Sequence, residues 1–437
     1  MKHPLTKIIE FQKQGKPVGI YSACTANEFV LEACMEQAIK TKSVLLIEST
    51  SNQVDHYGGY TGMTPKDFVN YVQNIANKTG LPMDRIILGG DHLGPLTFTK
   101  YDEEQAMKEA KELVKQYVLA GFTKIHIDTS MKVNSDDPNT RLSDETIARR
   151  GATLAKVCEE AYEELLKTNP KAIQPVYIVG SEVPIPGGSQ DAVETEMQVT
   201  KVSDFKATYQ AFKEAFAKEG LTKAWDNVIA IVVQPGVEEK DAGCTQYNRE
   251  KAIDLMNSIK EYPTLIFEGH STDYQTKVKL KELVEDGVGI LKVGPGLTFA
   301  AREAIFSLAF IEKELYKNTD VKQSNIMEIL EEEMLKEPKY WSKHYHGSDN
   351  EKALKRKYSF SDRSRYYLPL ERVSEAIQTL LHNLKDGVPL NLLSQFMPIA
   401  YTKVRLGELE NDPIALIKDR VAYTVDEYLY ATNQQEL

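Results

Sequence analysis

The stretch Arg85-Ile86-Ile87-Leu88-Gly89-Gly90-Asp91-His92 joins a short apolar run to a glycine pair, an acid and a histidine. The run has the length and the branched side chains of a buried strand, and the polar residues stand where that strand would end. Polar groups at the carboxyl ends of buried strands are typical of a parallel sheet that carries a site along one edge. The stretch therefore predicts an enzyme-like pocket.

The same arrangement recurs along the chain. We predict strands at residues 18–24, 44–48, 86–90, 124–128, 176–180, 228–233, 264–268 and 289–293, with Lys- and Glu-rich amphipathic helices between them. Eight continuous apolar strands that alternate with helices predict an α/β fold of the (β/α)₈ barrel type. A doubly wound open sheet is the alternative, but it would usually have an early GxGxxG turn, and the sequence has none.

The pattern changes after Phe299, because helix then follows helix to Leu437. We therefore predict a barrel with the pocket in residues 1–311 and a helical extension in residues 312–437. The extension is rich in aromatic residues. These aromatic residues favour an internal core, and a surface that binds a partner is the second interpretation.

Composition excludes several classes of function. The net charge of -11 argues against nucleic-acid binding, which needs a basic face. The four cysteines form no CxxC pair, which is typical of a reduced compartment. No signal peptide is recognisable, and no apolar stretch approaches the about 20 residues that a membrane span needs. We expect a cytoplasmic protein that binds neither nucleic acid nor membrane.

Two histidines, His92 and His270, stand at predicted strand ends beside acids. Neutral imidazole binds divalent metals, and a neighbouring carboxylate fixes its tautomer. One such histidine would more often be a hydrogen-bonded core residue, but two at matching positions favour metal ligands. His126 shares a strand face with Lys124 and Asp128. It is a candidate pocket residue and a less favoured ligand.

Five carboxylates also follow predicted strands: Glu48, Asp91, Asp128, Glu182 and Glu268. At one barrel mouth they would repel each other unless a cation or hydrogen bonds compensated their charges. A divalent ion is the simplest compensation, so the sequence predicts a metal site.

The seventh predicted strand continues into Ser271-Thr272-Asp273, and the eighth into Lys292-Val293-Gly294-Pro295-Gly296. Backbone amides at a helix start after strands seven and eight form the usual phosphate seat of these barrels. A plain tight turn explains the glycines equally well. Both interpretations stay open at this point.

The chain resembles one known family along its whole length. The matching stretches are residues 47–54, 58–65, 87–95, 233–238, 269–275 and 291–295, with 358–363 and 394–398 near the end. They resemble the large, so-called non-catalytic subunit of class II D-tagatose-1,6-bisphosphate aldolase, a family that also includes ketohexose 4-epimerase-like members.

The resemblance implies roles for individual residues. Related zinc-dependent aldolases have an Asp-His pair, matched by Asp91 and His92, and a later histidine, matched by His270. A further metal histidine would fall near Gln234, and the asparagine and aspartate of the eighth strand are missing from residues 292–296. The implied metal is zinc, with manganese or another divalent ion as the alternative. The implied metal ligands are His92, His270, Glu182 and Gln234; the catalytic groups are Asp91, Glu182 and Asp128; the substrate or phosphate contacts are Glu48, Asn52, Ser271, Thr272, Asp273, Lys292 and Gly294.

Two functions follow from these expectations. The first is a supporting subunit that stabilises a separate catalytic class II tagatose-bisphosphate aldolase subunit in tagatose or galactitol metabolism. The second is a stand-alone metal-dependent ketohexose 4-epimerase that acts on tagatose, fructose or their phosphates by retro-aldol and aldol steps. A sugar kinase is least favoured, since no P-loop lysine motif is present. Assembly into a homo-oligomer is left open.

Overall fold

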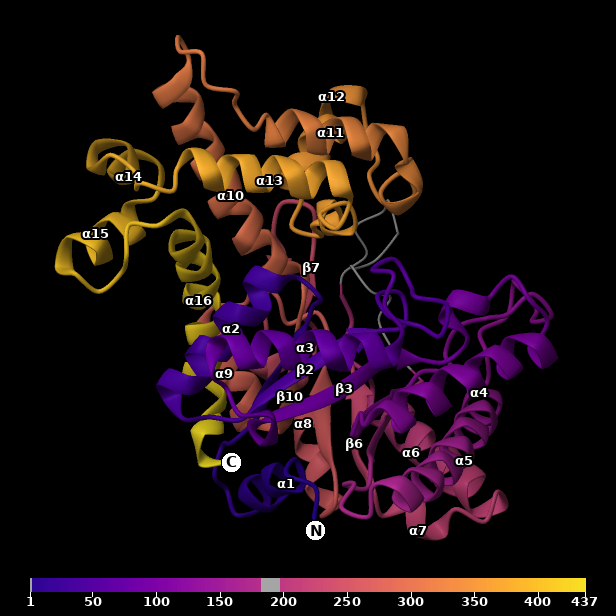
Figure 1. Ribbon diagram of the computed structural model, residues 1–437. Helices are drawn as coiled ribbons and strands as arrows, with labels where there is room; N and C mark the ends of the chain where they lie inside the picture. Colours follow the sequence, from indigo (N-terminus) through magenta and orange to yellow (C-terminus); the bar gives the residue numbers. More distant parts are fainter. Residues whose placement is uncertain (1, 182–196) are drawn as a thin grey trace.

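The computed structural model describes residues 2–181 and 197–437, and its centre is a closed barrel of parallel strands (Figure 1). The strands neighbour each other in the order β1-β10-β9-β6-β5-β4-β3-β2, which confirms the predicted (β/α)₈ barrel. Their bounds are β1 Ile20–Cys24, β2 Leu45–Thr50, β3 Ile86–Leu93, β4 Lys124–Ile127, β5 Val176–Val179, β6 Val228–Val233, β9 Ile266–Gly269 and β10 Val288–Val293. A short antiparallel pair, β7 (Glu238–Glu239) and β8 (Cys244–Thr245), follows β6.

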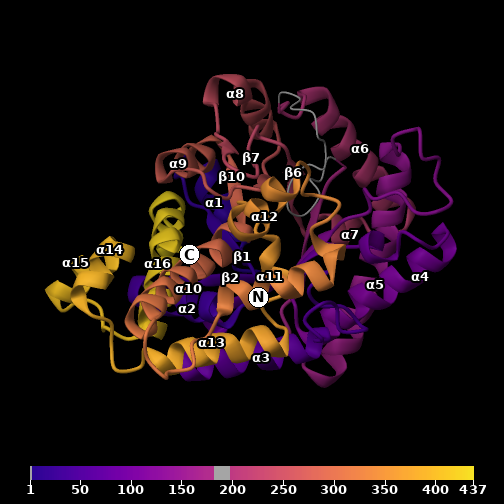
Figure 2. The same cartoon turned by 90° about the horizontal axis from the view of Figure 1, so that it is seen from above.

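Helices between the strands surround the barrel (Figures 1 and 2). They are α2 Glu28–Thr41, α3 Pro65–Thr79, α4 Glu103–Ala120, α5 Asp144–Thr168, α6 Val202–Lys218, α7 Thr222–Trp225, α8 Arg249–Ser258 and α9 Lys277–Asp286. Their starts carry the expected caps: Thr64 and Asp67 form a capping box on α3, and Ser143 caps α5. The first helix, α1 (Thr6–Lys13), closes the amino-terminal end of the barrel with Leu5, Ile8 and Ile9.

The barrel interior changes from apolar to charged along the strands. Side chains two residues apart point to the same face of a strand, so Ile266 and Glu268 on β9 both point inward, as do Ile290 and Lys292 on β10. The lower layer is apolar and packs on α1. The layer above it carries charges. The sequence therefore places an apolar layer at the amino-terminal end of the barrel interior and a charged layer toward its carboxyl end.

Seven helices follow β10: α10 Pro295–Tyr316, α11 Ile326–Lys336, α12 Asp349–Tyr358, α13 Glu371–Asn383, α14 Leu390–Phe396, α15 Pro398–Leu406 and α16 Pro413–Thr432. Helices α11 to α13 lie above the carboxyl end of the barrel, and α14 and α15 project to one side (Figures 1 and 2). The predicted boundary between residues 311 and 312 falls within α10. The division into two domains stays a prediction.

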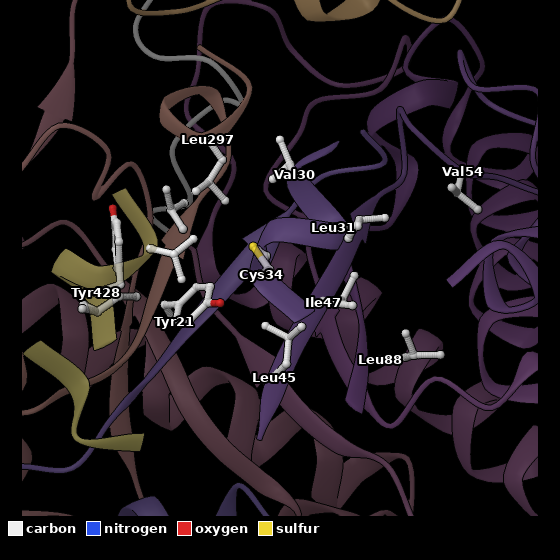
Figure 3. Close-up of a cluster of buried hydrophobic side chains, with 14 of the residues drawn as sticks. Tyr21, Val30, Leu31, Cys34, Leu45, Ile47, Val54, Leu88, Leu297 and Tyr428 are labelled. Atoms are coloured by element: carbon white, nitrogen blue, oxygen red, sulfur yellow. The ribbon is translucent and has the colours of Figure 1, made fainter. Parts of the chain in front are cut away.

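The last long helix, α16, packs against α2, α9, α10 and β1, and so covers the barrel between its first and seventh units. Its Tyr428 reaches the outer core beside Tyr21, with ring centroids 5.8 Å apart (Figure 3). Beyond the helix, the Gln434 side chain accepts a hydrogen bond from the Tyr21 N–H and donates one to the Val44 carbonyl. The end of the chain is thus part of the barrel wall. None of the described helices is long and apolar enough to cross a bilayer.

Candidate active site

A cavity that is partly open to solvent lies at the carboxyl end of the barrel. Strand ends and the loops after them supply most of its lining: Cys24, Thr50, Asn52, Gln53, Asp91, His92, Glu239, His270, Ser271, Asp273, Lys292, Val293, Gly294 and Pro295. Tyr60 joins them from the loop after β2. Arg365 and Tyr366 reach the same cavity from the helical extension.

The floor of the cavity is a buried network of ion pairs. The Lys124 ammonium lies 2.6 Å from Oε1 of Glu48 and 2.7 Å from Oε2 of Glu268, and all three side chains are buried. The Lys292 ammonium lies 2.8 Å from Oε2 of Glu48 and also contacts Asp91. Buried charges need such partners, because each one loses its hydration. Burial alone would lower the pKa of Lys292, but the carboxylates, Asp91 first, hold it well above its usual value.

Gly89 makes room for this network. A Cβ atom at position 89 would lie 2.6 Å from Cγ of Glu48 and 3.2 Å from Cδ of Lys124. No side chain larger than hydrogen fits there unless the ion pairs move. The first glycine of the Gly-Gly-Asp-His motif is therefore required by the charged layer beside it.

The Asp91-His92 pair lies on an irregular part of β3. Pairing with β4 shifts register between Gly90 and Leu93, and His92 has a positive φ of 50°. Such a bulge lets consecutive side chains share one site, where a regular strand would place them on opposite faces. Asp91 Oδ1 lies 2.7 Å from Nδ1 of His126, and His92 Nδ1 lies 2.7 Å from Oδ2 of Asp128.

These contacts fix the charge states of the pair. Burial opposes the ionisation of Asp91, but His92, Lys292 and His126 outweigh it and hold the Asp91 pKa well below its usual value. Burial would likewise lower the pKa of His92, yet Asp91 and Asp128 raise it above its ordinary value. Asp91 is thus an ionised carboxylate held among cationic and hydrogen-bonding partners.

Three imidazoles meet at the mouth. The ring centroids of His92, His126 and His270 are separated by 5.1 to 5.2 Å. Burial, followed by the charge of Lys292, lowers the pKa of His270 to about 3, so this ring is neutral at physiological pH. Its Nε2 lies 2.9 Å from Oε1 of Glu268.

Two of these imidazoles and two neighbouring carboxylates could hold a divalent metal. One ligand atom from each of Asp91, His126, Glu268 and His270 lies within 4.8 Å of the others. The buried Nε2 atom of His126 has no hydrogen-bond partner, so this nitrogen is free to bind a ligand. Two imidazoles and two carboxylates are a donor set that zinc and manganese both accept.

The structure places the other predicted ligands differently. Gln234 follows β6, and its carboxamide oxygen accepts hydrogen bonds from the N–H groups of Gly236 and Val237, at 2.8 and 2.9 Å. That oxygen is therefore engaged by its own loop. Asp128 bonds His92 and Ser130, so it orients the histidine from behind. Glu182 lies outside the described residues.

The predicted substrate contacts after β9 and β10 are bonded to one another. The Asp273 carboxylate accepts hydrogen bonds from the Gly294 and Gly296 N–H groups, and Thr272 donates to the Lys292 carbonyl. Burial and the neighbouring Glu239 raise the pKa of Asp273 to about 7. Burial also raises the pKa of Glu239 above its ordinary value. Asn52 and Ser271 line the cavity, whereas Thr272 is buried beneath it.

Sequence reasoning missed several residues of the cavity. Lys124 was named only as a neighbour of His126, although a lysine inside a buried apolar strand is itself a signal of an internal ion pair. Glu239 lies in the loop after β6 but beyond the strand end itself, and Arg365 and Tyr366 follow no barrel strand, so the strand-end pattern could not select them. The Tyr366 ring packs edge-on against Tyr60, 4.8 Å between centroids, and so joins the extension to the rim.

A closed parallel barrel whose mouth gathers histidines, acids and lysines from successive strands defines a (β/α)₈ protein with an enzyme-like site that is compatible with a divalent metal. The family model for "D-tagatose-1,6-bisphosphate aldolase subunit GatZ/KbaZ-like" matches residues 5–433. The chain belongs to this family, as its motifs predicted, and its role is related to tagatose-bisphosphate aldolase.

Solved structures were compared with the whole chain. A probable tagatose 6 phosphate kinase from Sinorhizobium meliloti 1021 is 40% identical, with a TM-score of 0.85 over 94% of this chain and 100% of that chain. A fructose-bisphosphate aldolase from Campylobacter jejuni is 15% identical, with a TM-score of 0.46 over 87% of this chain and 91% of that one. The YdjI aldolase from Escherichia coli K12 is 12% identical, with a TM-score of 0.40 over 87% of this chain and 97% of that one.

Proposed function

We propose that this chain is the supporting, non-catalytic subunit of a class II D-tagatose-1,6-bisphosphate aldolase and that it stabilises a separate catalytic subunit in the cytoplasm. Membership of the aldolase-subunit family supports an aldolase-related role. The kinase name of the Sinorhizobium meliloti protein belongs to that protein and is not carried over to this chain.

The observation that carries the proposal is the state of Gln234. The resemblance to class II aldolases puts a metal histidine near this position, but here the Gln234 oxygen is held by two backbone N–H groups of its own loop. The loop after β10 also has no asparagine or aspartate side chain to hold a bisphosphate substrate. A site without these parts is poorly suited to aldol cleavage on its own.

We propose zinc as the metal, with Asp91, His126, Glu268 and His270 as the residues that would hold it. When bound, zinc would polarise a carbonyl oxygen of the substrate. Lys292 contacts Asp91 and lies 3.9 Å from Oε1 of Glu268, so the metal would share both carboxylates with this ammonium group.

The catalytic subunit is proposed to bind the projecting helices α14 and α15. Large apolar side chains are exposed there: Leu406 is 65% exposed and Ile399 is 49% exposed. Beside them, Phe396, Met397 and Tyr423 line a groove between these helices, α10 and α16, whose lining also includes Glu303, Asp419 and Arg420. Exposed apolar and aromatic groups of this kind are enriched at the cores of interfaces.

Size-exclusion chromatography with a class II tagatose-bisphosphate aldolase subunit tests this assignment. The two chains should co-elute, and the aldolase should have a longer thermal half-life. Leu406→Asp combined with Ile399→Asp should abolish co-elution. Ile253→Asp is the matched control, because Ile253 is 53% exposed on helix α8 of the barrel and should leave the complex intact. Separate elution of the wild-type chains with an unchanged half-life would refute the proposal.

A second function is favoured by one observation, the unpartnered Nε2 atom of His126 beside Asp91 and His270. This nitrogen could bind the metal in place of the histidine that is missing at Gln234, so the chain could act alone as a ketohexose 4-epimerase. In that reaction the C4 hydroxyl gives its proton to a base and the C3–C4 bond breaks. Recombination on the other face of the aldehyde then inverts C4.

Incubation of the zinc- or manganese-loaded chain with D-tagatose or D-fructose, followed by NMR, distinguishes the two functions. Interconversion that Asp91→Asn removes would establish the epimerase. The absence of any conversion, together with co-elution with the aldolase, would leave the supporting role alone.

A further inference from the structure

The start of helix α10 faces the cavity, and its first backbone N–H groups are all in hydrogen bonds. Those of Gly294 and Gly296 donate to the same oxygen, Oδ1 of Asp273, at 3.0 and 2.7 Å. Pro295 has no N–H group. The next two N–H groups donate to the Gly294 carbonyl, at 3.0 and 3.3 Å. The positive end of this 22-residue helix is therefore occupied by a carboxylate of the protein itself.

Asp273 is built into this position. It is only 2% exposed, and the residue before it is tied to β10 by two hydrogen bonds from Thr272 to the Lys292 carbonyl. A Cβ atom at Gly296 would lie 3.0 Å from the Asp273 oxygen, so the close approach of the carboxylate depends on glycine there. The arrangement places a carboxyl group of the protein where the helix would otherwise attract an anion.

Two cations lie in the lining of the cavity, and each already has partners in the protein. Lys292 is paired with Glu48 and Asp91. The Arg365 guanidinium donates to the carbonyls of Ser361 and Asp362 and to the Tyr366 hydroxyl. Glu239 adds a second carboxyl group on the Asp273 side of the lining.

We propose that Asp273 determines the specificity of this pocket by filling the phosphate seat of the barrel, so that the end of the pocket beside α10 takes an unphosphorylated, hydroxyl-bearing end of a sugar. A carboxyl group accepts hydrogen bonds from hydroxyl groups, and this one already occupies the two backbone N–H groups that a phosphate would need. The proposal concerns the chain's own ligand, so it holds whether or not the aldolase subunit binds.

NMR of the full-length chain labelled with ¹⁵N-glycine tests the proposal at the atoms concerned. Inorganic phosphate should leave the Gly294 and Gly296 amide resonances of the wild-type chain unchanged, while D-tagatose should shift them. In Asp273→Ser the amides lose their internal acceptor. Phosphate should then shift both resonances, and its affinity should rise at least about tenfold, the change expected when two hydrogen-bond donors at a helix start become free for an anion.

Two further variants serve as a replacement for the serine variant and as a control. Asp273→Asn retains an acceptor oxygen without the charge, and it should give an intermediate response if the serine variant does not fold. Asp84→Ser changes an exposed acid before β3 and should respond as wild type does. Phosphate shifts of Gly294 and Gly296 that are as large in wild type as in the Asp273 variants would overturn the proposal, as would a wild-type chain in which D-tagatose leaves both resonances unmoved.

Discussion

His92 Nδ1 lies 2.7 Å from Oδ2 of Asp128, and this contact joins the consecutive strand ends of β3 and β4. Asp128 also accepts hydrogen bonds from the backbone N–H and the hydroxyl of Ser130, so its own position is fixed. The buried carboxylate therefore orients the imidazole and favours its protonated form.

Replacing Asp128 with asparagine should lower the pKa of His92. Burial lowers this pKa, and the charges of Asp91 and Asp128 together raise it above the ordinary value, so loss of one charge removes part of that effect. The imidazole ¹⁵N shifts of His92, followed through a pH titration, measure the change. Ser130→Ala is the control, since it removes a neutral neighbour of Asp128. A His92 pKa equal in Asp128→Asn and wild type would contradict this account.

Replacing Lys124 with methionine should strongly destabilise the fold. The change leaves Glu48 and Glu268 buried without this ammonium, and loss of one partner of a buried pair lowers the free energy of unfolding by about 3–5 kcal/mol. Urea denaturation measures it. Lys115→Met is the matched control, because Lys115 pairs with Glu164 at the surface and its loss should change stability by less than about 1 kcal/mol. Equal effects of the two substitutions would show that the buried network is not needed.

Stability should fall in mild acid through His270. Its folded pKa is about 3 and its ordinary value is 6.5, so between these values the unfolded chain binds a proton that the folded chain does not. The contribution is present above pH 6.5 and is lost as the pH falls toward 3. The free energy of unfolding of the metal-free chain, measured from pH 6.5 down to about 5, should decrease more steeply than in His270→Asn. The raised pKa of Asp273 acts in the opposite direction in both proteins and cancels in the difference. Parallel curves would refute the assignment.

Metal analysis should find about one divalent ion per chain after reconstitution with zinc. His126→Ala combined with His270→Ala should remove it, because both imidazoles of the proposed site are lost. His382→Ala, in an exposed position on α13, should retain the metal. Unchanged metal content in the double variant would place the ion elsewhere.

The fold was predictable because the eight apolar strands and the charged helices between them leave a strong periodic signal. The strand ends were less predictable. Asp91 and His92 were expected just after their strand, but they lie within β3, because a bulge extends pairing to Leu93. Sequence periodicity carries no information about such a bulge.

The sequence showed that the clustered acids need compensating positive charge, but it did not show which groups supply that charge. The clustered acids required a cation, and a metal was the expected one, yet Lys124 and Lys292 already pair with Glu48, Glu268 and Asp91. Arg365 could not be assigned to the cavity for a different reason. It reaches the barrel only through the tertiary packing of the helical extension, and no local pattern encodes that contact.

Cleavage of D-tagatose 1,6-bisphosphate tests the central claim most directly. The assay compares the zinc-loaded chain alone, the catalytic aldolase subunit alone and their mixture at equal subunit concentrations. The account predicts no cleavage by this chain alone and a higher activity of the mixture than of the catalytic subunit by itself. Cleavage by this chain alone that Asp91→Asn abolishes, or a mixture no more active than the catalytic subunit, would contradict it.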